Sequence, residues 1–265
     1  MNPQDVAMEK TILNVANVSK RFGGIQALSG VDISIRHGQI YGLIGPNGAG
    51  KTTFFNVLTG LYIPDGGDFE LDGKAYKPAA VHEVAFAGIA RTFQNIRLFS
   101  EMTVLENVMV GRHMRTHCGL AGAVLRTRKF KIEEQEIAKR AQSLLDYVGI
   151  GRFAQYKART LSYGDQRRLE IARALSTDPK LIALDEPAAG MNASEKGVLR
   201  NLINQIRHDG HTILLIEHDV KLVMGLCDRV AVLDYGKQIA EGTPSEVQSN
   251  QQVIEAYLGA SHSTR

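Results

Sequence analysis

The sequence lacks the features that mark secreted, membrane-spanning and cysteine-rich metal-binding proteins. It has only two cysteines, Cys118 and Cys227, which lie far apart and form no CxxC pair, so a disulfide framework and a cysteine zinc site are excluded. No apolar run reaches the roughly 18 residues that cross a bilayer, and the polar start of the chain is unlike a signal peptide. The sequence also has no internal repeat or low-complexity tract, which argues against a solenoid or a coiled-coil rod.

Net charge is also small. The 31 Lys and Arg residues against 28 Asp and Glu leave a formal charge of +3 over 265 residues. This charge is too small to indicate nucleic acid binding by itself, and we expect no nucleic acid partner. With 44% apolar and 22% charged residues, the composition is that of a globular protein long enough to bury a core. We therefore expect an intracellular α/β-type protein, rich in glycine.

Short apolar runs alternate with helical patterns along most of the chain. Strands are expected at 12–18, 31–35, 39–44, 68–71, 74–76, 181–184, 212–216 and 230–233. A helix is expected at 52–61, and helical spacing continues from 102 to 148. This alternation predicts a mostly parallel sheet. The block 96–160 carries no strand pattern, and we interpret it as a helical subdomain inserted into an α/β core.

The strongest signal is a glycine-rich segment between an apolar run and a helical pattern, which fits the phosphate-binding pattern GxxxxGK[ST]. Main-chain N–H groups can converge on phosphate oxygens where no Cβ intervenes, and the following helix adds the positive end of its dipole. We predict that Lys51 reaches the β- and γ-phosphates of a nucleotide and that the Thr52 hydroxyl binds Mg²⁺. The residues assigned to nucleotide binding are Gly45, Pro46, Asn47, Gly48, Ala49, Gly50, Lys51, Thr52 and Thr53.

A second motif, LIALDEP, is an apolar strand that ends in the carboxylates Asp185 and Glu186. Such an aspartate is often only a strand end, but in a chain with a phosphate-binding loop it is expected to hold the outer sphere of Mg²⁺. Glu186 can then orient and deprotonate the attacking water. A glutamate at this position favours hydrolysis over simple binding.

Between these motifs lies LSYGDQ, residues 161–166, followed by a helical pattern. The order of the glycine-rich loop, Gln94, LSYGDQ, LIALDE and His218 resembles the ATP-binding cassette (ABC) ATPases, whose own signature is LS-x-G-x-Q. Ser162 is expected to cap a helix whose N-terminus faces a phosphate, and the resemblance implies that this phosphate belongs to ATP held by the opposite subunit. An ordinary N-capped helix is the alternative. The residues assigned to this contact are Ser162, Tyr163, Gly164, Asp165 and Gln166.

Further positions take their roles from the same resemblance. Gln94 matches the Q-loop, which ligates Mg²⁺ and links the core to the helical subdomain. His218 matches the switch histidine that contacts the γ-phosphate, so Gln94 and His218 join Glu186 as catalytic candidates. Phe22 occupies the position of the ring that stacks on adenine, with a core phenylalanine as the equal alternative. Asn192 replaces the Asp that is usual in the family's D-loop.

The resemblance covers nearly the whole chain and implies a P-loop (RecA-like) α/β core with a mostly parallel sheet, an N-terminal antiparallel β subdomain and a helical insert. It divides a single nucleotide-binding domain, 1–265, into an ATP-binding core at about 1–95 and 161–265 and a helical subdomain at 96–160. Two ATPase subunits are expected to enclose two ATP molecules, with Mg²⁺, and to hydrolyse ATP to ADP and phosphate.

The same resemblance indicates solute transport. The segments AGIARTFQNIRLFSEMTVLENVMVG, EPAAGMN and EGTPSEVQSNQQVIEAYLG are similar to the importers of branched-chain amino acids. The implied partners are two transmembrane permease subunits, a second ABC ATPase subunit and, indirectly, an external solute-binding protein, which places the chain on the inner face of the cytoplasmic membrane. Lipopolysaccharide export, urea or amide import and a soluble P-loop ATPase are the alternatives.

Two weaker groups of residues complete the sequence. His113, His117 and Cys118 have a spacing that suits a metal site on a helix, but without further ligands exposed polar residues are the better interpretation. A basic cluster could contact anionic lipid head groups, although a solvated helical face is favoured. This cluster consists of Arg126, Arg128, Lys129 and Lys131.

Overall fold

The computed structural model describes residues 10–115 and 127–260 and divides them into two compact units. Unit 1 consists of residues up to 91 together with 180–188 and 200 onward, and unit 2 consists of 92–179 and 189–199. No helix in the described ranges is long and apolar enough to cross a membrane.

Unit 1 contains an antiparallel sheet of four strands in the order β2-β1-β4-β5. Its strands are β1 (Thr11–Phe22), β2 (Ile25–Arg36), β4 (Gly66–Leu71) and β5 (Lys74–Ala75). The expected turn at 23–24 joins β1 to β2, and Gly23 takes a φ of +55° there, a value at which glycine avoids the steric cost of a Cβ. Alternate residues of β2 are buried, so the period-2 pattern of the sequence correctly indicated one core-facing side.

Unit 1 also contains a six-stranded sheet in the order β10-β9-β3-β8-β7-β6, parallel except for the edge strand β10. The strands are β3 (Ile40–Ile44), β6 (Ile89–Arg91), β7 (Leu181–Asp185), β8 (Thr212–Ile216), β9 (Arg229–Asp234) and β10 (Lys237–Gly242). Every residue of β3, β7 and β8 is buried, as continuous apolar runs in a parallel sheet require. Because the strands are parallel, β3, β7 and β8 end at the same edge.

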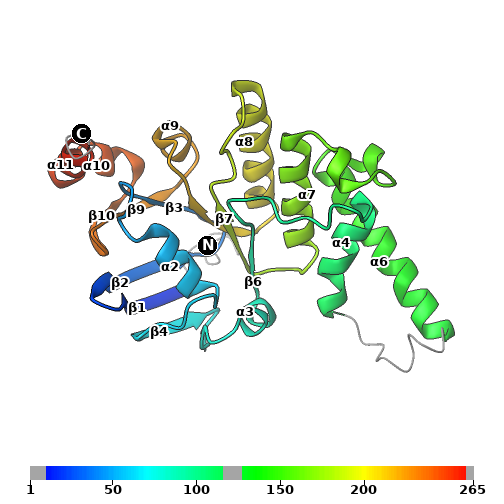
Figure 1. The fold of residues 1–265 in the computed structure, drawn as a ribbon, viewed down its shortest axis with the longest axis horizontal. Coiled ribbons are helices and arrows are strands. Elements are labelled where there is room, and N and C mark those ends of the chain that lie inside the picture. The colour runs from blue at the N-terminus through cyan, green and yellow to red at the C-terminus, as the bar shows by residue number, and fades with distance from the viewer. Residues whose placement is uncertain (1–9, 116–126, 261–265) are drawn as a thin grey trace, which may run out of the picture. The chain divides into compact units, whose positions relative to one another are not determined.

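The helices of unit 1 include α2, which leaves the carboxyl end of β3, and Figure 1 shows it beside β1 and β2. Phe54 and Phe55 of α2 are fully buried in the core shared by both sheets. The helices are α2 (Lys51–Leu58), α3 (Val81–Ala87), α9 (Val220–Met224), α10 (Pro244–Gln248) and α11 (Gln251–Ala260). The sequence predicted that α2 continues to residue 61, and this end is wrong: Gly60 has a φ of +75°, which terminates the helix.

Unit 2 is helical, and α4 (Val104–Arg112), α6 (Arg128–Tyr147) and α7 (Tyr163–Leu175) pack against one another (Figure 1). Short 3₁₀ turns, η1 (His113–Arg115), η2 (Gly151–Phe153) and η3 (Ala158–Thr160), connect them, and α8 (Ala193–His208) begins in this unit. Thr103 caps α4 with a reciprocal capping box to Glu106. Gly111 allows α4 to approach α7 closely, since a Cβ there would lie 2.6 Å from the Arg173 carbonyl oxygen.

Candidate active site

The glycine-rich segment forms a loop between β3 and α2, and its shape depends on glycine. Gly45, Gly48 and Gly50 have φ values of +150°, +81° and +102°, a region that side chains with a Cβ disfavour. A Cβ on Gly45 would lie 2.1 Å from the Leu233 carbonyl oxygen, whereas one on Gly48 would meet nothing within 4 Å. The loop is therefore packed against β9 at its start and open at its middle, in front of the N-terminus of α2, where an anion is stabilised.

The side chain of Lys51 lies inside this loop. It is 5% exposed, and its Nζ donates hydrogen bonds to the carbonyl oxygens of Gly45 at 2.6 Å and Pro46 at 2.9 Å. Burial lowers the pKa of this ammonium group, and the nearby negative charge of Glu186 opposes the shift. Thr52 is exposed in the first turn of α2. The remaining loop positions are exposed at Asn47 and Gly48, half-buried at Pro46, Gly50 and Thr53, and buried at Ala49.

Asp185 and Glu186 lie where β7 ends, with exposures of 5% and 7%. The Arg91 guanidinium lies 3.9 Å from Asp185 Oδ2 and donates to Thr59 Oγ1 at 2.6 Å. Asp185 and Thr52 offer a carboxylate and a hydroxyl oxygen, the hard ligands that Mg²⁺ prefers, so the chemistry of the donor set fits that ion.

Glu186 has an unusual backbone. Its φ is +45°, in the left-handed region that costs a residue with a Cβ about 1–2 kcal/mol. Its main-chain N–H donates to the Ile216 carbonyl oxygen at 2.9 Å, and its Oε1 contacts Nε2 of His218, which is half-exposed on the side chain. The structure therefore brings together two of the three predicted catalytic residues, a carboxylate and an imidazole. Strained residues of this kind cluster at functional sites.

The LSYGDQ segment belongs to unit 2, where it forms the start of α7. Ser162 is the N-cap, as predicted, and its Oγ accepts a hydrogen bond from the N–H of Asp165 at 3.2 Å. Asp165 forms an ion pair with Arg168, and Gln166 Nε2 donates to the Leu161 carbonyl oxygen at 3.1 Å. A small cavity of about 100 Å³ is lined by Ser162, Gly164, Asp165, Arg168, Met191, Ser194, Glu195, Val198 and Leu199.

Gln94 also belongs to unit 2, and its main chain is held by a residue that the sequence analysis missed. Arg167, 1% exposed, donates to the carbonyl oxygens of Phe93 and Gln94 and lies 3.0 Å from Glu170 Oε2. A buried arginine needs such partners to offset the loss of hydration. The sequence signal was a charged pair three residues apart within a helical pattern, which does not by itself reveal burial.

Phe22, at the end of β1, is 42% exposed and meets Tyr62 edge-on with ring centroids 5.2 Å apart. The alternative of a core phenylalanine is therefore wrong, and stacking on adenine stays a prediction. Asn192 has a local role: its Oδ1 accepts from the N–H of Glu195 at 3.0 Å, while Glu195 Oε2 accepts from the N–H of Asn192 at 2.9 Å. This reciprocal pair caps the start of α8.

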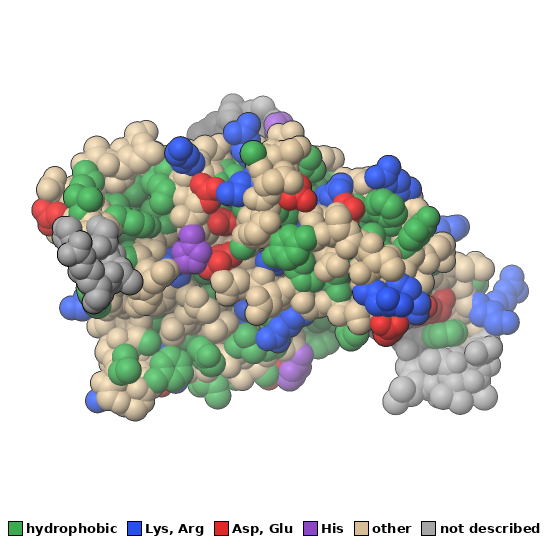
Figure 2. All heavy atoms as spheres, turned by 45° about the horizontal axis from the view of Figure 1, so that its top comes forward, with side chains coloured by type: hydrophobic (Ala, Val, Ile, Leu, Met, Phe, Trp, Pro, Cys, Tyr) green, Lys and Arg blue, Asp and Glu red, His purple; other side chains and the backbone are tan. Residues whose placement is uncertain are grey.

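The weaker groups of the sequence lie partly outside the described residues, as His117, Cys118 and Arg126 do. His113 Nε2 lies 3.6 Å from Glu134 Oε1, and no cluster of three metal-binding side chains occurs in the described ranges. Arg128, Lys129 and Lys131 are exposed. On the face drawn in Figure 2, the Lys and Arg side chains in blue are interspersed with acidic and hydrophobic ones rather than joined into one basic surface.

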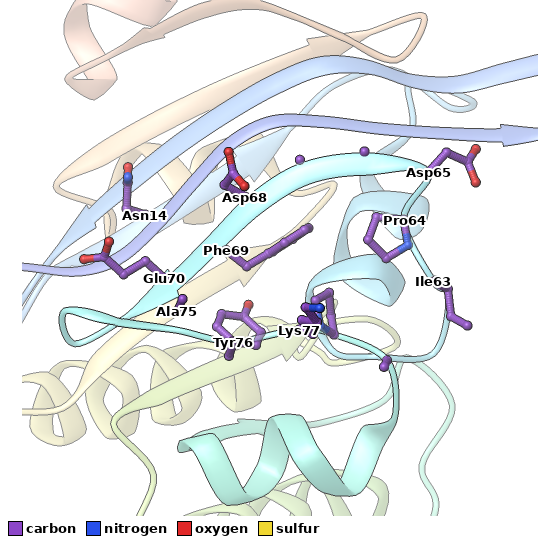
Figure 3. Close-up of a pocket in the computed structure, with 14 residues that line it drawn as sticks. Asn14, Ile63, Pro64, Asp65, Asp68, Phe69, Glu70, Ala75, Tyr76 and Lys77 are labelled. Carbon is purple, nitrogen blue, oxygen red and sulfur yellow. The ribbon is translucent and has the colours of Figure 1, made fainter.

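A cavity of about 560 Å³ lies in the antiparallel part of unit 1, between β4 and the segment after β5 (Figure 3). Its lining includes Ile63, Phe69 and Tyr76, and none of the predicted site residues contributes to it. We assign no part of the nucleotide chemistry to it.

Comparison with known proteins decides the family. The sequence model described as "ABC transporter" matches residues 28–189, more than half of the chain. The chain belongs to the ABC transporter family. As an ABC ATPase subunit it binds nucleotide and hydrolyses ATP, and ATPases of this family's import systems work as dimers with permease partners in the membrane. A second model, "Branched-chain amino acid ATP-binding cassette transporter", matches residues 237–263.

Curated relatives of this ABC ATPase span nearly its whole length. It is 45% identical to the high-affinity branched-chain amino acid transport ATP-binding protein BraF of Pseudomonas aeruginosa over 95% of the chain and 99% of the relative. It is 47% identical to LivG of Salmonella typhimurium, which carries the same description, with the same coverage. The lipopolysaccharide export ATP-binding protein LptB of Haemophilus influenzae is 34% identical over 94% of the chain and 98% of the relative.

Solved structures confirm the predicted fold class. The ADP conformation of an ATP-binding cassette of an ABC transporter superposes with a TM-score of 0.82 at 34% identity, covering 94% of this chain and 99% of that one. A dimeric cassette in a post-hydrolysis state bound to ADP and phosphate gives a TM-score of 0.74 at 27% identity, covering 88% and 99%.

Proposed function

We propose that this ABC ATPase supplies the energy for uptake of branched-chain amino acids. The observation that carries the proposal is the 45–47% identity to ATP-binding proteins named for branched-chain amino acid transport, over 95% of the chain. The match of residues 237–263 to the branched-chain model adds independent support. Lipopolysaccharide export is the second candidate, because an export ATPase is 34% identical over nearly the same length.

The chemistry of the proposed site follows from the residues that surround it. The main-chain N–H groups of the loop and the ammonium group of Lys51 bind the phosphates of ATP, the substrate. Glu186 orients and deprotonates the attacking water, and His218, in contact with it, stabilises charge at the γ-phosphate. Mg²⁺, when held by Thr52, Asp185 and Gln94, neutralises charge on the phosphate oxygens. Phe22 stacks on the adenine.

The site is completed by a second ATPase subunit. In this proposal the segment 162–166 contacts ATP held by the opposite subunit, because the N-terminus of α7 offers main-chain N–H groups and the positive end of the helix dipole to an anion. The free energy of ATP binding then shifts the populations of two conformations of the transporter. The proposed assembly contains two permease subunits and two ATPase subunits at the inner face of the cytoplasmic membrane, and an external binding protein delivers the solute. We propose that the helical subdomain at 96–160, with the signature at its end, links the core at 1–95 and 161–265 to the permeases.

The experiment that tests this proposal uses the Glu186→Gln variant, purified with ATP from detergent-solubilised membranes. We expect the variant to retain ATP and stay assembled, so that its companions can be identified by mass spectrometry. Two different permeases plus a second ATPase support amino acid import, and binding of leucine, isoleucine or valine to the associated external protein then tests the solute. Export-type membrane subunits with this ATPase alone would favour lipopolysaccharide, and no membrane subunit would overturn the transport proposal. The same purification without ATP is the control.

A further inference from the structure

Glu217 is a buried carboxylate, next to His218 in the sequence, that the proposed mechanism does not use. It follows the last residue of β8, is 4% exposed, and accepts three main-chain hydrogen bonds. Oε1 accepts from the N–H of Ala188 at 2.8 Å, and Oε2 accepts from the N–H groups of His218 at 3.1 Å and Asp219 at 3.5 Å. One side chain thus connects the loop after β7 with the loop after β8.

These bonds matter because of the backbone of Glu186. The residue between Glu186 and Ala188 is Pro187, which has no N–H to donate. The nearest main-chain donors of this segment are therefore the N–H of Glu186, bonded to the Ile216 carbonyl oxygen, and the N–H of Ala188, bonded to Glu217. A buried glutamate at a φ of +45° keeps that strained conformation because the surrounding structure holds it there.

The buried charge of Glu217 also indicates a role other than stabilising the fold. Burial raises the pKa of its carboxyl group, and the negative charge of Glu186 raises it further, while the three main-chain N–H groups act in the opposite direction. A second acid so close to the first is unfavourable unless its hydrogen bonds compensate. The stability of the fold does not require an acid at this position, because a buried apolar side chain would avoid the desolvation penalty of a buried charge.

We propose that Glu217 is a positioning residue for ATP hydrolysis, which holds Glu186 in its left-handed conformation and fixes the start of the loop that carries His218. The inference rests on the proposed roles of Glu186 and His218. Glu217 forms no hydrogen bond with the phosphate-binding loop among the described contacts, so it acts on the hydrolytic step and not on the binding of ATP.

The test is Glu217→Gln in the assembled transporter, with Glu246→Gln as the matched control. The amide has the shape of the carboxylate but only one accepting oxygen, so it cannot hold both loops. We expect kcat for ATP to fall about tenfold to a hundredfold, the range for losing a hydrogen bond to a charged group, with KM unchanged within about twofold. Glu246 also accepts a main-chain N–H, that of Thr243, but it caps α10, so its variant should keep the wild-type kcat. A wild-type kcat for Glu217→Gln, or a rise in KM alone, would overturn the proposal.

Amide hydrogen exchange separates positioning from a general loss of folding. We expect faster exchange at Ala188 or His218 in Glu217→Gln, with the interior amides of β7 and β8 as protected as in the wild type. Uniformly faster exchange throughout unit 1 would contradict a positioning role. Where Glu217→Gln does not fold, Glu217→Asp replaces it: the shorter acid keeps its bonds to the adjacent N–H groups and loses Ala188, so kcat must still fall.

A double variant distinguishes this inference from the function on which it rests. His218→Ala alone must slow single-turnover hydrolysis, and if it does not, the proposed role of His218 fails. If it does, Glu217→Gln should reduce the rate of single-turnover hydrolysis by a smaller factor in the His218→Ala background than in the wild type. The reason is that part of the effect of Glu217 is exerted by positioning His218. Full additivity, with unchanged exchange at Ala188, would overturn the positioning role.

Discussion

Substituting the first glycine of the phosphate-binding loop should destabilise the fold far more than substituting its central glycine. A Cβ on Gly45 would lie 2.1 Å from the Leu233 carbonyl oxygen, at a φ of +150°. Backbone strain costs about 1–3 kcal/mol and forced overpacking a similar amount, so we expect Gly45→Ala to lower the free energy of unfolding by about 2–6 kcal/mol. Gly48 has a φ of +81° with open space around the added methyl, so Gly48→Ala should cost only about 1–2 kcal/mol.

Urea unfolding of the two variants beside the wild type measures this difference. For both variants the free energy of unfolding should fall with urea concentration at the wild-type slope, so that differences between the midpoints report differences in stability directly. Since a domain of this kind has about 5–15 kcal/mol in total, Gly45→Ala should unfold at a clearly lower urea concentration. Equal midpoints for the two variants, or a lower one for Gly48→Ala, would refute the argument that packing against β9 fixes the start of the loop.

Substitutions at three further positions test the helix cap, the phosphate contact and a surface ion pair. Ser162→Ala should lower the free energy of unfolding by about 1 kcal/mol through the lost N-cap. Ser162→Asp should restore the cap yet abolish ATP hydrolysis by placing negative charge at the proposed phosphate contact, and hydrolysis by this variant would contradict that contact. Lys51→Ala should weaken ATP binding about tenfold or more, measured by titration calorimetry, and unchanged affinity would remove its phosphate role. Hydrogen bonds from Lys10 and Lys180 lower the pKa of Asp72 in the folded protein, so Asp72→Asn should lower the free energy of unfolding by under about 1 kcal/mol at neutral pH. This difference must shrink as the pH falls from about 4, the pKa of an aspartate in the unfolded chain, towards the lower pKa of Asp72 in the folded protein. A difference that grows at low pH would contradict the pairing.

Much of the fold followed from the sequence because its signals were local. The continuous apolar runs at 181–184 and 212–216 became the buried strands β7 and β8, and Ser162 caps α7 as predicted. Short or weakly patterned elements were missed: β6 has three residues, and its strand character depends on pairing with β7. Periodicity over so few residues carries no information.

The candidate site was predictable in its motifs and not in the contacts that support them. Glu186 was expected from its place after an apolar strand, but its left-handed backbone was not, because nothing in a local pattern requires a glutamate at positive φ. Arg167 and Glu217 are charged, and charge in a sequence usually indicates a surface position. Their burial arises from partners 73 and 29 residues away along the chain, which only the tertiary structure brings together.

The most direct test of the central claim compares ATP binding and ATP turnover in Glu186→Gln and wild type, both in the assembled transporter. If Glu186 activates the attacking water, ATP affinity should stay within about twofold while kcat falls about a hundredfold or more. Turnover at the wild-type rate, with ATP bound as in the wild type, would contradict the assignment of Glu186 as the base of an ATP-hydrolysing transport subunit.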